Sequence, residues 1–401
     1  MSTLPCAMPV SSLPAECDIA VVGGGMVGAA AACRLAQSGL RVCVLECAVP
    51  QPFCAEQAMD LRVSAISPAS ITLLKACGVW QQLLAMRACA YRRLEVWERE
   101  EMATRFHADE LGVSELGYIV ENRLIQLALW QELERLGVSL CVPAKLMALQ
   151  QDASGVDLTL SGGQRLRTRL VLGADGAHSL TRSLSHIGTT SWDYRQRCLL
   201  VNVDIAGGQQ DITWQQFTPQ GPRAFLPLAG SHASLVWYDT PERIRALEAM
   251  PVTQLAQEIL SHFPSRLPEF QVTGRGSFAL TRRHAQRYVA GRVVLLGDAA
   301  HTIHPLAGQG VNLGFRDVTE LCQRIAEALQ SGEAWDDGLV LKGYERVRRR
   351  DNQLMQSAMD LFYLTFSNQA APLRLLRNVG LLAAEHAGPI KRKALRYALG
   401  L

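Results

Sequence analysis

Long apolar runs, paired cysteines and a strong net charge are all missing from this sequence of 401 residues. No segment approaches the roughly 18 apolar residues that span a bilayer, so we expect a soluble or peripheral protein. The formal net charge of +3 is too small to indicate nucleic-acid binding. The 11 cysteines show no CxxC pair or metal-ligand spacing, so we expect free thiols, no metal site and a cytoplasmic setting. Residues 1–15 lack a charged n-region and a long apolar run, so we expect a loose leader.

A glycine-rich turn, GGGMVG, lies between apolar segments near the N-terminus. We expect a strand, a helix and a second strand at residues 18–22, 29–37 and 41–45. Gly23 permits the tight turn, Gly25 lets the backbone approach a pyrophosphate, and Gly28 lets helix and strand pack closely. Glu46 follows the second strand, where an acid binds the ribose hydroxyls of an adenosine. An acid here disfavours a 2′-phosphate, so the unit predicts FAD or NAD.

Two more glycine turns follow predicted strands far along the chain. Gly173-Ala174-Asp175-Gly176 ends one strand, and Gly297-Asp298 ends another. Asp298 suits a hydroxyl-rich ligand such as a ribityl chain, and a helix beginning near Val311 directs its positive end at the same ligand. With pyrophosphate at the first turn and an isoalloxazine at the last, the order fits FAD better than NAD. No second GxGxxG follows a strand, so a nicotinamide donor would bind only transiently.

The middle of the chain changes to an alternating pattern rich in aromatic residues. Four strands are expected at residues 198–205, 212–217, 223–227 and 233–238, which favours an antiparallel sheet. The predicted fold class is α/β, a Rossmann-like FAD-binding domain interleaved with an antiparallel-sheet substrate domain, plus C-terminal helices. The expected FAD-binding domain comprises residues 16–90, 120–182 and 284–330, the substrate domain residues 91–119 and 183–283, and the helical region residues 331–401.

Several side chains have two interpretations at this stage. One aromatic group either fills the sheet's core or lines an apolar substrate pocket: Trp214, Phe217, Phe225, Trp237 and Tyr238. The basic C-terminal residues either form a solvated rim or contact anionic lipid or a protein partner: Lys391, Arg392, Lys393 and Arg396. Arg62 either pairs with a phosphate or lies at the surface, and Asn122 is expected to cap a helix.

The sequence resembles the single-component FAD-dependent aromatic hydroxylases, the para-hydroxybenzoate hydroxylase fold group, through GGGMVG, GADG and GDAAHTIHPLAGQGVNLG. Within that group it is similar to the ubiquinone-biosynthesis hydroxylases, through LRVSAISPASITLLKACGVW and GYIVENRLIQLALW. The segment TWQQFTPQGPRAFLPLAGSHASLVWYD is most similar to the branch that acts on 2-polyprenyl-3-methyl-6-methoxy-1,4-benzoquinol. The likeness extends over residues 17–401.

This resemblance implies the cofactor-binding residues. They are Gly23, Gly25, Gly28, Glu46, Arg62, Arg123, Asp175, Asp298, Gly308, Gly310 and Asn312, with Asp175 implicated also in nicotinamide binding. Pro305 is expected near the flavin ring, and no side-chain base is assigned. His304 departs from the family, which often carries Asn there. Structural roles are expected for His301 and His304.

The resemblance also implies an activity. NAD(P)H or another reductant reduces FAD, O2 adds at flavin C4a, and the distal oxygen of the hydroperoxide goes to the ring of a polyprenylated benzoquinol in ubiquinone biosynthesis. Expected partners are a ubiquinone-biosynthesis protein complex and, peripherally, the inner membrane. The alternatives are hydroxylation at another ring position of the same pathway and a flavin-bearing, non-catalytic component of a complex. The ring position, tail length, reductant and oligomeric state are not defined by the sequence.

Overall fold

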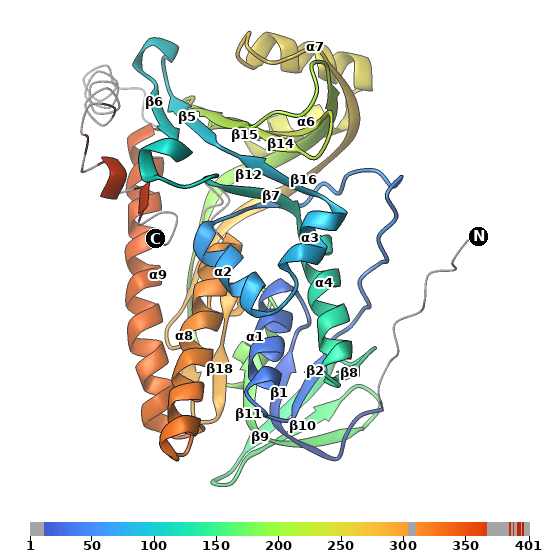
Figure 1. Ribbon diagram of the computed structural model, residues 1–401, viewed down its shortest axis with the longest axis vertical. Coiled ribbons are helices and arrows are strands. Elements are labelled where there is room, and N and C mark those ends of the chain that lie inside the picture. The colour runs from blue at the N-terminus through green and yellow to red at the C-terminus, as the bar shows by residue number, and fades with distance from the viewer. Residues whose placement is uncertain are drawn as a thin grey trace.

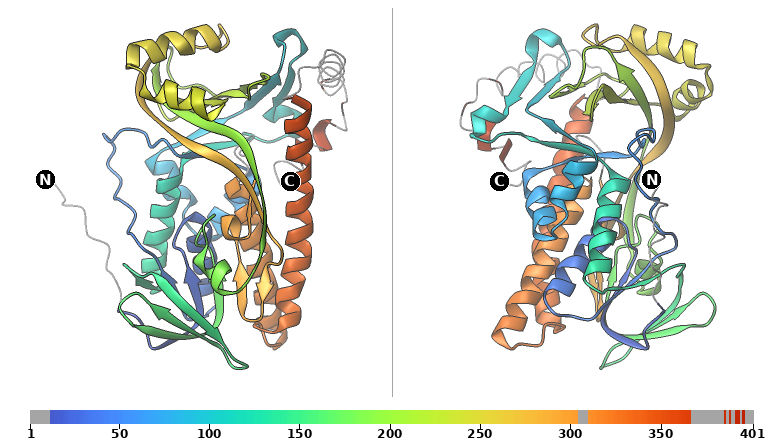
Figure 2. Two further views of the ribbon diagram at one scale, coloured as in Figure 1. Left: turned by 180° about the vertical axis from the view of Figure 1, so that it is seen from behind. Right: turned by 45° about the vertical axis from the view of Figure 1, so that its right-hand side comes forward.

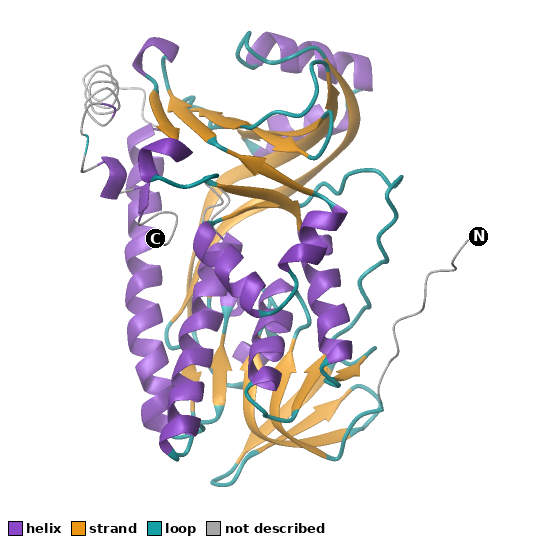
Figure 3. Cartoon of the chain, viewed as in Figure 1, coloured by secondary structure: helices purple, strands orange, loops and turns teal. Residues whose placement is uncertain are grey.

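A computed structural model of the chain describes residues 12–303, 310–366, 385, 388, 391–393 and 395–396, without the side chains of residues 195, 362–364 and 366. The helices are α1 (Met26–Gln37), α2 (Pro68–Ala76), α3 (Trp80–Met86), α4 (Asn122–Arg135), α5 (Leu180–Leu184), α6 (Pro241–Ala249), α7 (Val252–His262), α8 (Gly310–Ser331) and α9 (Gly338–Phe366). Figures 1 and 3 show a lower half in which helices cover a sheet and an upper half built mainly on a second sheet.

The strands of the lower sheet are β1 (Glu16–Val22), β2 (Val42–Leu45), β8 (Ser139–Cys141), β9 (Leu146–Gln151), β10 (Val156–Leu160), β11 (Arg165–Gly173), β17 (Val289–Ala290) and β18 (Val293–Leu295). The order across it is β17-β18-β11-β1-β2-β8, and β18, β11, β1, β2 and β8 run parallel. Such strands must bury both faces, which explains the continuous apolar run VCVL of β2. α1 packs between α4 and α8 on one face (Figure 1).

The upper sheet contains β5 (Arg93–Trp97), β6 (Thr104–His107), β12 (Thr189–Ile205), β13 (Ile212–Gln216), β14 (Arg223–Leu228), β15 (His232–Asp239), β16 (Phe270–Ala285) and β19 (His301–Thr302). Its order is β19-β16-β12-β15-β14-β13-β5-β6. The four strands predicted to form an antiparallel sheet do so as β12, β15, β14 and β13, and β5 joins β13 in parallel. A third, small sheet joins β3 (Val63–Ile66), β7 (Gly117–Glu121) and β4 (Ala88–Tyr91). The α/β fold class is confirmed, whereas the domain boundaries stay a prediction.

β12 is much longer than the strand predicted at residues 198–205, and its partner β16 is nearly as long. β12 has 17 residues and β16 has 16, and they pair along their length. The ribbon they form descends from the upper sheet into the lower half (Figure 2). There β16 pairs with β19, which directly follows the Asp298 turn. The upper sheet is therefore hydrogen-bonded to the segment that was expected to hold the flavin.

Local chemistry explains two details of the helices. α6 and α7 are two helices rather than one, because Pro251 forces Met250 into an extended conformation. The cap predicted at Asn122 is wrong by one residue, since Glu121 occupies the N-cap of α4. The Asn122 side chain instead accepts the Ser64 hydroxyl at 2.7 Å.

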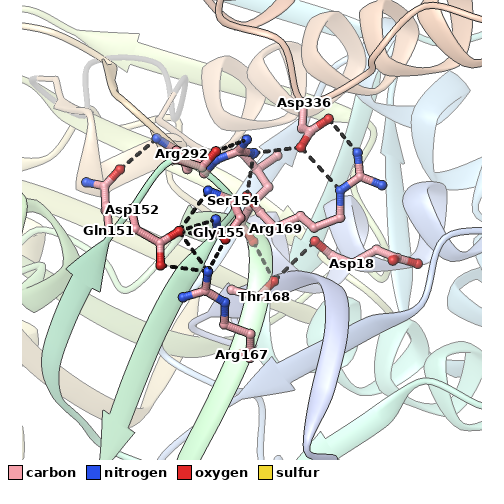
Figure 4. Close-up of polar contacts among 12 residues, drawn as sticks. Asp18, Gln151, Asp152, Ser154, Gly155, Arg167, Thr168, Arg169, Arg292 and Asp336 are labelled. Carbon is pink, nitrogen blue, oxygen red and sulfur yellow. Dashed lines mark hydrogen bonds and ion pairs between the residues drawn. The ribbon is translucent and has the colours of Figure 1, made fainter.

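A charged cluster joins the lower sheet to the connection between α8 and α9 (Figure 4). The Asp336 carboxylate accepts hydrogen bonds from Arg169 of β11 and from Arg292, just before β18, each at 2.6 Å. Burial by itself would raise the pKa of Asp336, but the two guanidinium groups lower it. The cluster therefore fixes the beginning of α9 to two parallel strands.

Every cysteine among the described residues is a free thiol, as predicted. Over the same residues, no group of side chains has the composition of a metal site. Nor does any described helix combine the length and the apolar character that crossing a bilayer requires.

Candidate functional site

Four turns lie at one edge of the lower sheet, because their strands are parallel and the carboxyl ends of parallel strands share an edge. Asp298 follows β18, Asp175 follows β11, Gly25 follows β1 and Glu46 follows β2. Neighbouring strands are about 4.8 Å apart, so the four strand ends span about 14 Å. The order of turns along this edge, Asp298 to Glu46, matches one elongated ligand with its hydroxyl chain at one end and its ribose at the other.

The first glycine turn packs tightly against the second. Gly23 has a φ of +100°, and a Cβ there would lie 2.4 Å from the carbonyl oxygen of Ala174. A Cβ at Gly28 would lie 1.9 Å from the carbonyl oxygen of Gly23. Both positions therefore exclude a side chain through contacts within the protein itself.

Gly25 differs from these two glycines because a Cβ there would meet no atom within 4 Å. The residue is the N-cap of α1, whose first turn has neither a side-chain cap nor an acidic residue. The backbone N–H groups at this end of α1 can accordingly bind an anion. Contacts within the protein do not require glycine at position 25, and the open space there fits the predicted approach of a pyrophosphate.

Glu46 is held in place by backbone groups. One carboxylate oxygen accepts the N–H of Gly24 and the other accepts the N–H of Cys47, each at 2.6 Å. A carboxylate accepts about four hydrogen bonds, so two acceptor positions remain for hydroxyl groups. The geometry is compatible with the ribose-binding role expected of this acid.

The carboxylate of Asp298 is accessible and yet desolvated. The residue is exposed, but surrounding protein atoms raise the pKa of its carboxyl, despite the nearby positive charges of His301, Arg62 and Arg283. No described residue donates a hydrogen bond to it. Because the carboxylate is exposed, a ligand hydroxyl can reach it.

Arg182, which was not predicted as a site residue, connects two of the turns. Its guanidinium donates to the carbonyl oxygen of Ala299 at 2.8 Å and to that of Ala177 at 3.0 Å. Asp175 is used locally, because it accepts the backbone N–H of Thr181 at 2.9 Å. The second and third turns are thus fixed relative to each other from inside the protein.

A buried ion network lies behind the Asp298 turn. Asp317 of α8 is 0 % exposed and accepts the N–H of Gly297 at 3.0 Å and His301 Nε2 at 2.6 Å. Its second oxygen accepts Arg348 Nε at 2.8 Å and Asn352 Nδ2 at 3.1 Å. Burial would raise the pKa of Asp317, but His301 and Arg348 lower it to about 2. The structural role expected of His301 agrees with this contact.

The polar partners on α9 recur every fourth residue, so they lie along one side of the helix. Tyr344 donates to the Leu295 carbonyl oxygen, Gln356 to those of Arg283 and Thr302, and Asp360 accepts the Tyr194 hydroxyl at 2.6 Å. We call this set the inner ladder of α9: Tyr344, Arg348, Asn352, Gln356 and Asp360. It connects the lower sheet, the Asp298 turn and the β12–β16 ribbon.

The remaining candidates lie in varied surroundings. Asn312 is 0 % exposed, and its side chain bonds the Ser67 N–H, the Ser70 hydroxyl and the Ala65 carbonyl oxygen. Arg123 donates to Asp60 and to two backbone carbonyl oxygens of the preceding loop. Gly310 is the first residue of α8, whereas His304, Pro305 and Gly308 lie outside the described residues. Cofactor contacts of these residues stay predictions.

The aromatic residues of the upper sheet divide between its two faces. Trp214, Phe225 and Trp237 form the core beneath α6 and α7. Tyr238 lies on the opposite face, in an apolar cluster with Cys198 and Leu280, against which Phe278 and Leu61 pack. The guanidinium of Arg62 lies 4.6 Å from the centre of the Phe278 ring, and its charge also acts on Asp298. The core interpretation therefore holds for Trp214, Phe225 and Trp237, whereas a substrate pocket beside Tyr238 stays a prediction.

Comparison with known proteins agrees with this geometry. The profile of the family described as FAD binding domain matches residues 16–358. The chain is 54 % identical to 3-demethoxyubiquinol 3-hydroxylase of Escherichia coli over 96 % of this chain and 98 % of that protein. It is 38 % identical to ubiquinone hydroxylase UbiL of Rhodospirillum rubrum, covering 96 % and 89 %. The crystal structure of p-nitrophenol 4-monooxygenase PnpA from Pseudomonas putida superposes with a TM-score of 0.75 at 19 % identity, covering 96 % and 97 %.

Proposed function

The chain belongs to the FAD binding domain family and is an FAD-dependent monooxygenase, and from this premise we propose that it hydroxylates the ring of a polyprenylated benzoquinol in ubiquinone biosynthesis. The observation that carries the proposal is the 54 % identity to a demethoxyubiquinol hydroxylase along nearly the whole chain. We extend the proposal to the same branch of substrates, 2-polyprenyl-3-methyl-6-methoxy-1,4-benzoquinols. Carbon 5 is the one ring carbon of these quinols that carries hydrogen, so it is the position that we propose is hydroxylated.

The site's residues suit the cofactor that the family requires. The open position at Gly25 and the uncapped end of α1 would hold the pyrophosphate, Glu46 the ribose and Asp298 the ribityl hydroxyls. Bound FAD supplies electron transfer from NAD(P)H and the activation of O2. The protein itself would position the cofactor and the substrate ring and would exclude water from them.

Two features of the chain would serve those ends. α8 begins at Gly310 with no acidic residue in its first turn, so its positive end would stabilise negative charge beside it. The cluster with Tyr238 and Cys198 is buried and apolar, so it would keep water from the reacting ring. The hydroxyl groups of the quinol already make its ring electron-rich. We therefore assign no side-chain base.

A direct assay tests this proposal. Purified protein with FAD, NAD(P)H and a demethoxyquinol analogue should yield a product heavier by one oxygen atom. Release of peroxide without any hydroxylated ring would overturn the assignment. A flavin-bearing protein without catalytic function would give neither product nor substrate-stimulated consumption of NAD(P)H.

Association with other proteins of the pathway and peripheral contact with the inner membrane are finer proposals. Co-purification from cells with the tagged full-length chain tests the first. Absence of every pathway protein from the eluate, at native expression, would contradict it.

A further inference from the structure

The helix α9 buries polar side chains and exposes large apolar ones, the reverse of an ordinary surface helix. Opposite the inner ladder lie Val347, Leu354 and Leu361, with 38 %, 60 % and 68 % of their surface exposed. The three are seven residues apart, so they form one row along the helix. At 1.5 Å per residue the row is about 21 Å long. We call it the outer row, and a row of this kind marks a surface for binding.

Charges on α9 are segregated in the same way. Lys342, Arg346 and Arg350 are exposed. The acidic residues have partners inside the protein: Glu345 accepts the Tyr288 N–H, Asp351 pairs with Arg348, and Asp360 pairs with Arg282. Within the described residues of α9, the outward side therefore combines apolar groups with positive charge only.

An exposed tryptophan lies beside this helix. Trp192 of β12 is 66 % exposed and stands opposite Arg282 of β16 in the antiparallel register. Paired residues project from the same face of a ribbon, and Arg282 contacts Asp360 of α9. Trp192 consequently projects on the side of the ribbon that faces α9. Tryptophan is enriched at the boundary between lipid and water.

We propose that the outer row, with Arg346, Arg350 and the neighbouring Trp192, binds an anionic lipid surface. α9 lies at one margin of the molecule over most of its height, where a flat surface can reach it (Figure 1). The proposal rests on the proposed function, because a polyprenyl benzoquinol resides in a bilayer and must be collected there. Pairing of α9 with a second copy of the chain would bring the arginines of two helices together, which their charges oppose.

Vesicle sedimentation with the FAD-loaded full-length protein tests the surface. The protein should bind vesicles of phosphatidylcholine mixed with phosphatidylglycerol. Binding should be much weaker to vesicles of phosphatidylcholine alone, and to the mixed vesicles at high salt. Leu354→Ser and Leu361→Ser should each reduce the partition coefficient about tenfold. Arg346→Gln and Arg350→Gln should each reduce it about fivefold. Equal binding of wild type and all four variants, or no binding at all, would overturn the proposal.

A matched control comes from α7, which lies at the top of the molecule away from α9 (Figure 1) and in which Leu260 is 66 % exposed. Leu260→Ser removes as much exposed apolar surface and should leave vesicle binding unchanged. Unchanged flavin absorbance establishes that each variant is folded. If Leu354→Ser instead converted a dimer into a monomer without affecting vesicle binding, the outer row would be an interface between copies.

The two proposals fail in different ways. Leu354→Ser with Leu361→Ser should hydroxylate a short-chain, water-soluble quinol as wild type does, yet lose most activity on long-chain quinol in vesicles. A wild type that binds vesicles but hydroxylates no quinol contradicts the proposed function alone. A wild type that hydroxylates both quinols without binding vesicles contradicts the lipid surface alone.

Discussion

The Asp317 carboxylate accepts the backbone N–H of Gly297 at 3.0 Å, across 20 residues of sequence. Gly297 directly precedes Asp298, so a buried acid of α8 fixes the turn that carries the exposed one. Arg348 supplies the balancing positive charge from α9. The last long helix of the described chain is therefore part of the support of the cofactor site.

Asp317→Asn tests this support. The substitution leaves Arg348 in a buried place without its full counter-charge, so we expect a loss of about 3 kcal/mol in unfolding free energy. A less firmly held turn should also raise the Kd for FAD about tenfold. Chemical denaturation and fluorescence titration with FAD measure the two effects.

The control for that variant is Asp152→Asn. Asp152 also pairs with an arginine, Arg167 (Figure 4), but the Asp152 side chain is exposed and that of Arg167 is partly exposed. Little change in stability or FAD binding is expected from an exposed pair. Equal effects of the two substitutions would contradict a special role for the Asp317 network.

Two glycines of one turn should respond oppositely to alanine. Gly28→Ala places a Cβ 1.9 Å from the Gly23 carbonyl oxygen, so we expect a loss above about 4 kcal/mol or failure to fold. Gly25→Ala meets no protein atom and keeps an ordinary backbone conformation, so the apoprotein should change by less than about 0.5 kcal/mol. The new methyl group should still raise the Kd for FAD about a hundredfold, because it occupies the approach of the pyrophosphate. Wild-type FAD affinity in Gly25→Ala would reject the proposed position of the phosphates.

Asp298→Ala should separate binding from stability. No described residue donates a hydrogen bond to the carboxylate, and desolvation by the surrounding protein atoms already disfavours its charge, so the apoprotein should not lose stability. Loss of hydrogen bonds from ligand hydroxyls to a charged group should cost about 2 kcal/mol, or about thirtyfold in Kd. Calorimetric titration of the variant with FAD measures the Kd, and an unchanged Kd would place the ribityl chain elsewhere.

His284 predicts a pH dependence of stability. Burial, together with the positive charges of His301, Arg349 and Arg282, lowers the pKa of His284 to about 4. The unfolded chain then binds a proton that the folded chain does not, so stability falls as the pH drops from about 6.5 to 4. The full effect is about 3 kcal/mol.

The comparison variant is His284→Phe, which cannot titrate and places a ring of similar size against Tyr288. Its unfolding free energy, measured at several pH values, should fall less steeply than that of wild type between pH 6.5 and 4. Asp317 does not confuse the result, because its contribution is lost only as the pH falls from about 4 toward 2. Parallel pH profiles would contradict the lowered pKa.

The glycine turns could be predicted because their requirements are local. A tight turn, a close helix and a strand end each restrict a few consecutive residues, as at Gly23 and Gly28. Parallel pairing then brings distant strand ends to one edge, which the alternation of strands and helices already indicated. Similarly, alternation located the strand with Trp237 and Tyr238 but did not decide which face meets the site.

The Asp317 network could not be predicted because its members meet only through packing. Asp317 follows Leu313 by four residues and precedes Leu321 by four, so an acid within an apolar helical face was the available signal. Arg348 stands in a run of arginines, and nothing in the sequence distinguishes it from its neighbours. The length of β12 was missed for a related reason, since residues 190–193 at its lower end are exposed and lack an apolar alternation.

The measurement that bears most directly on the central claim uses isotopically labelled dioxygen. The FAD-loaded protein is given NAD(P)H and a demethoxyquinol, and the product is analysed by mass spectrometry. Incorporation of one labelled oxygen atom at the ring is the predicted result. An unlabelled ring, with NAD(P)H consumed and peroxide released, would contradict it.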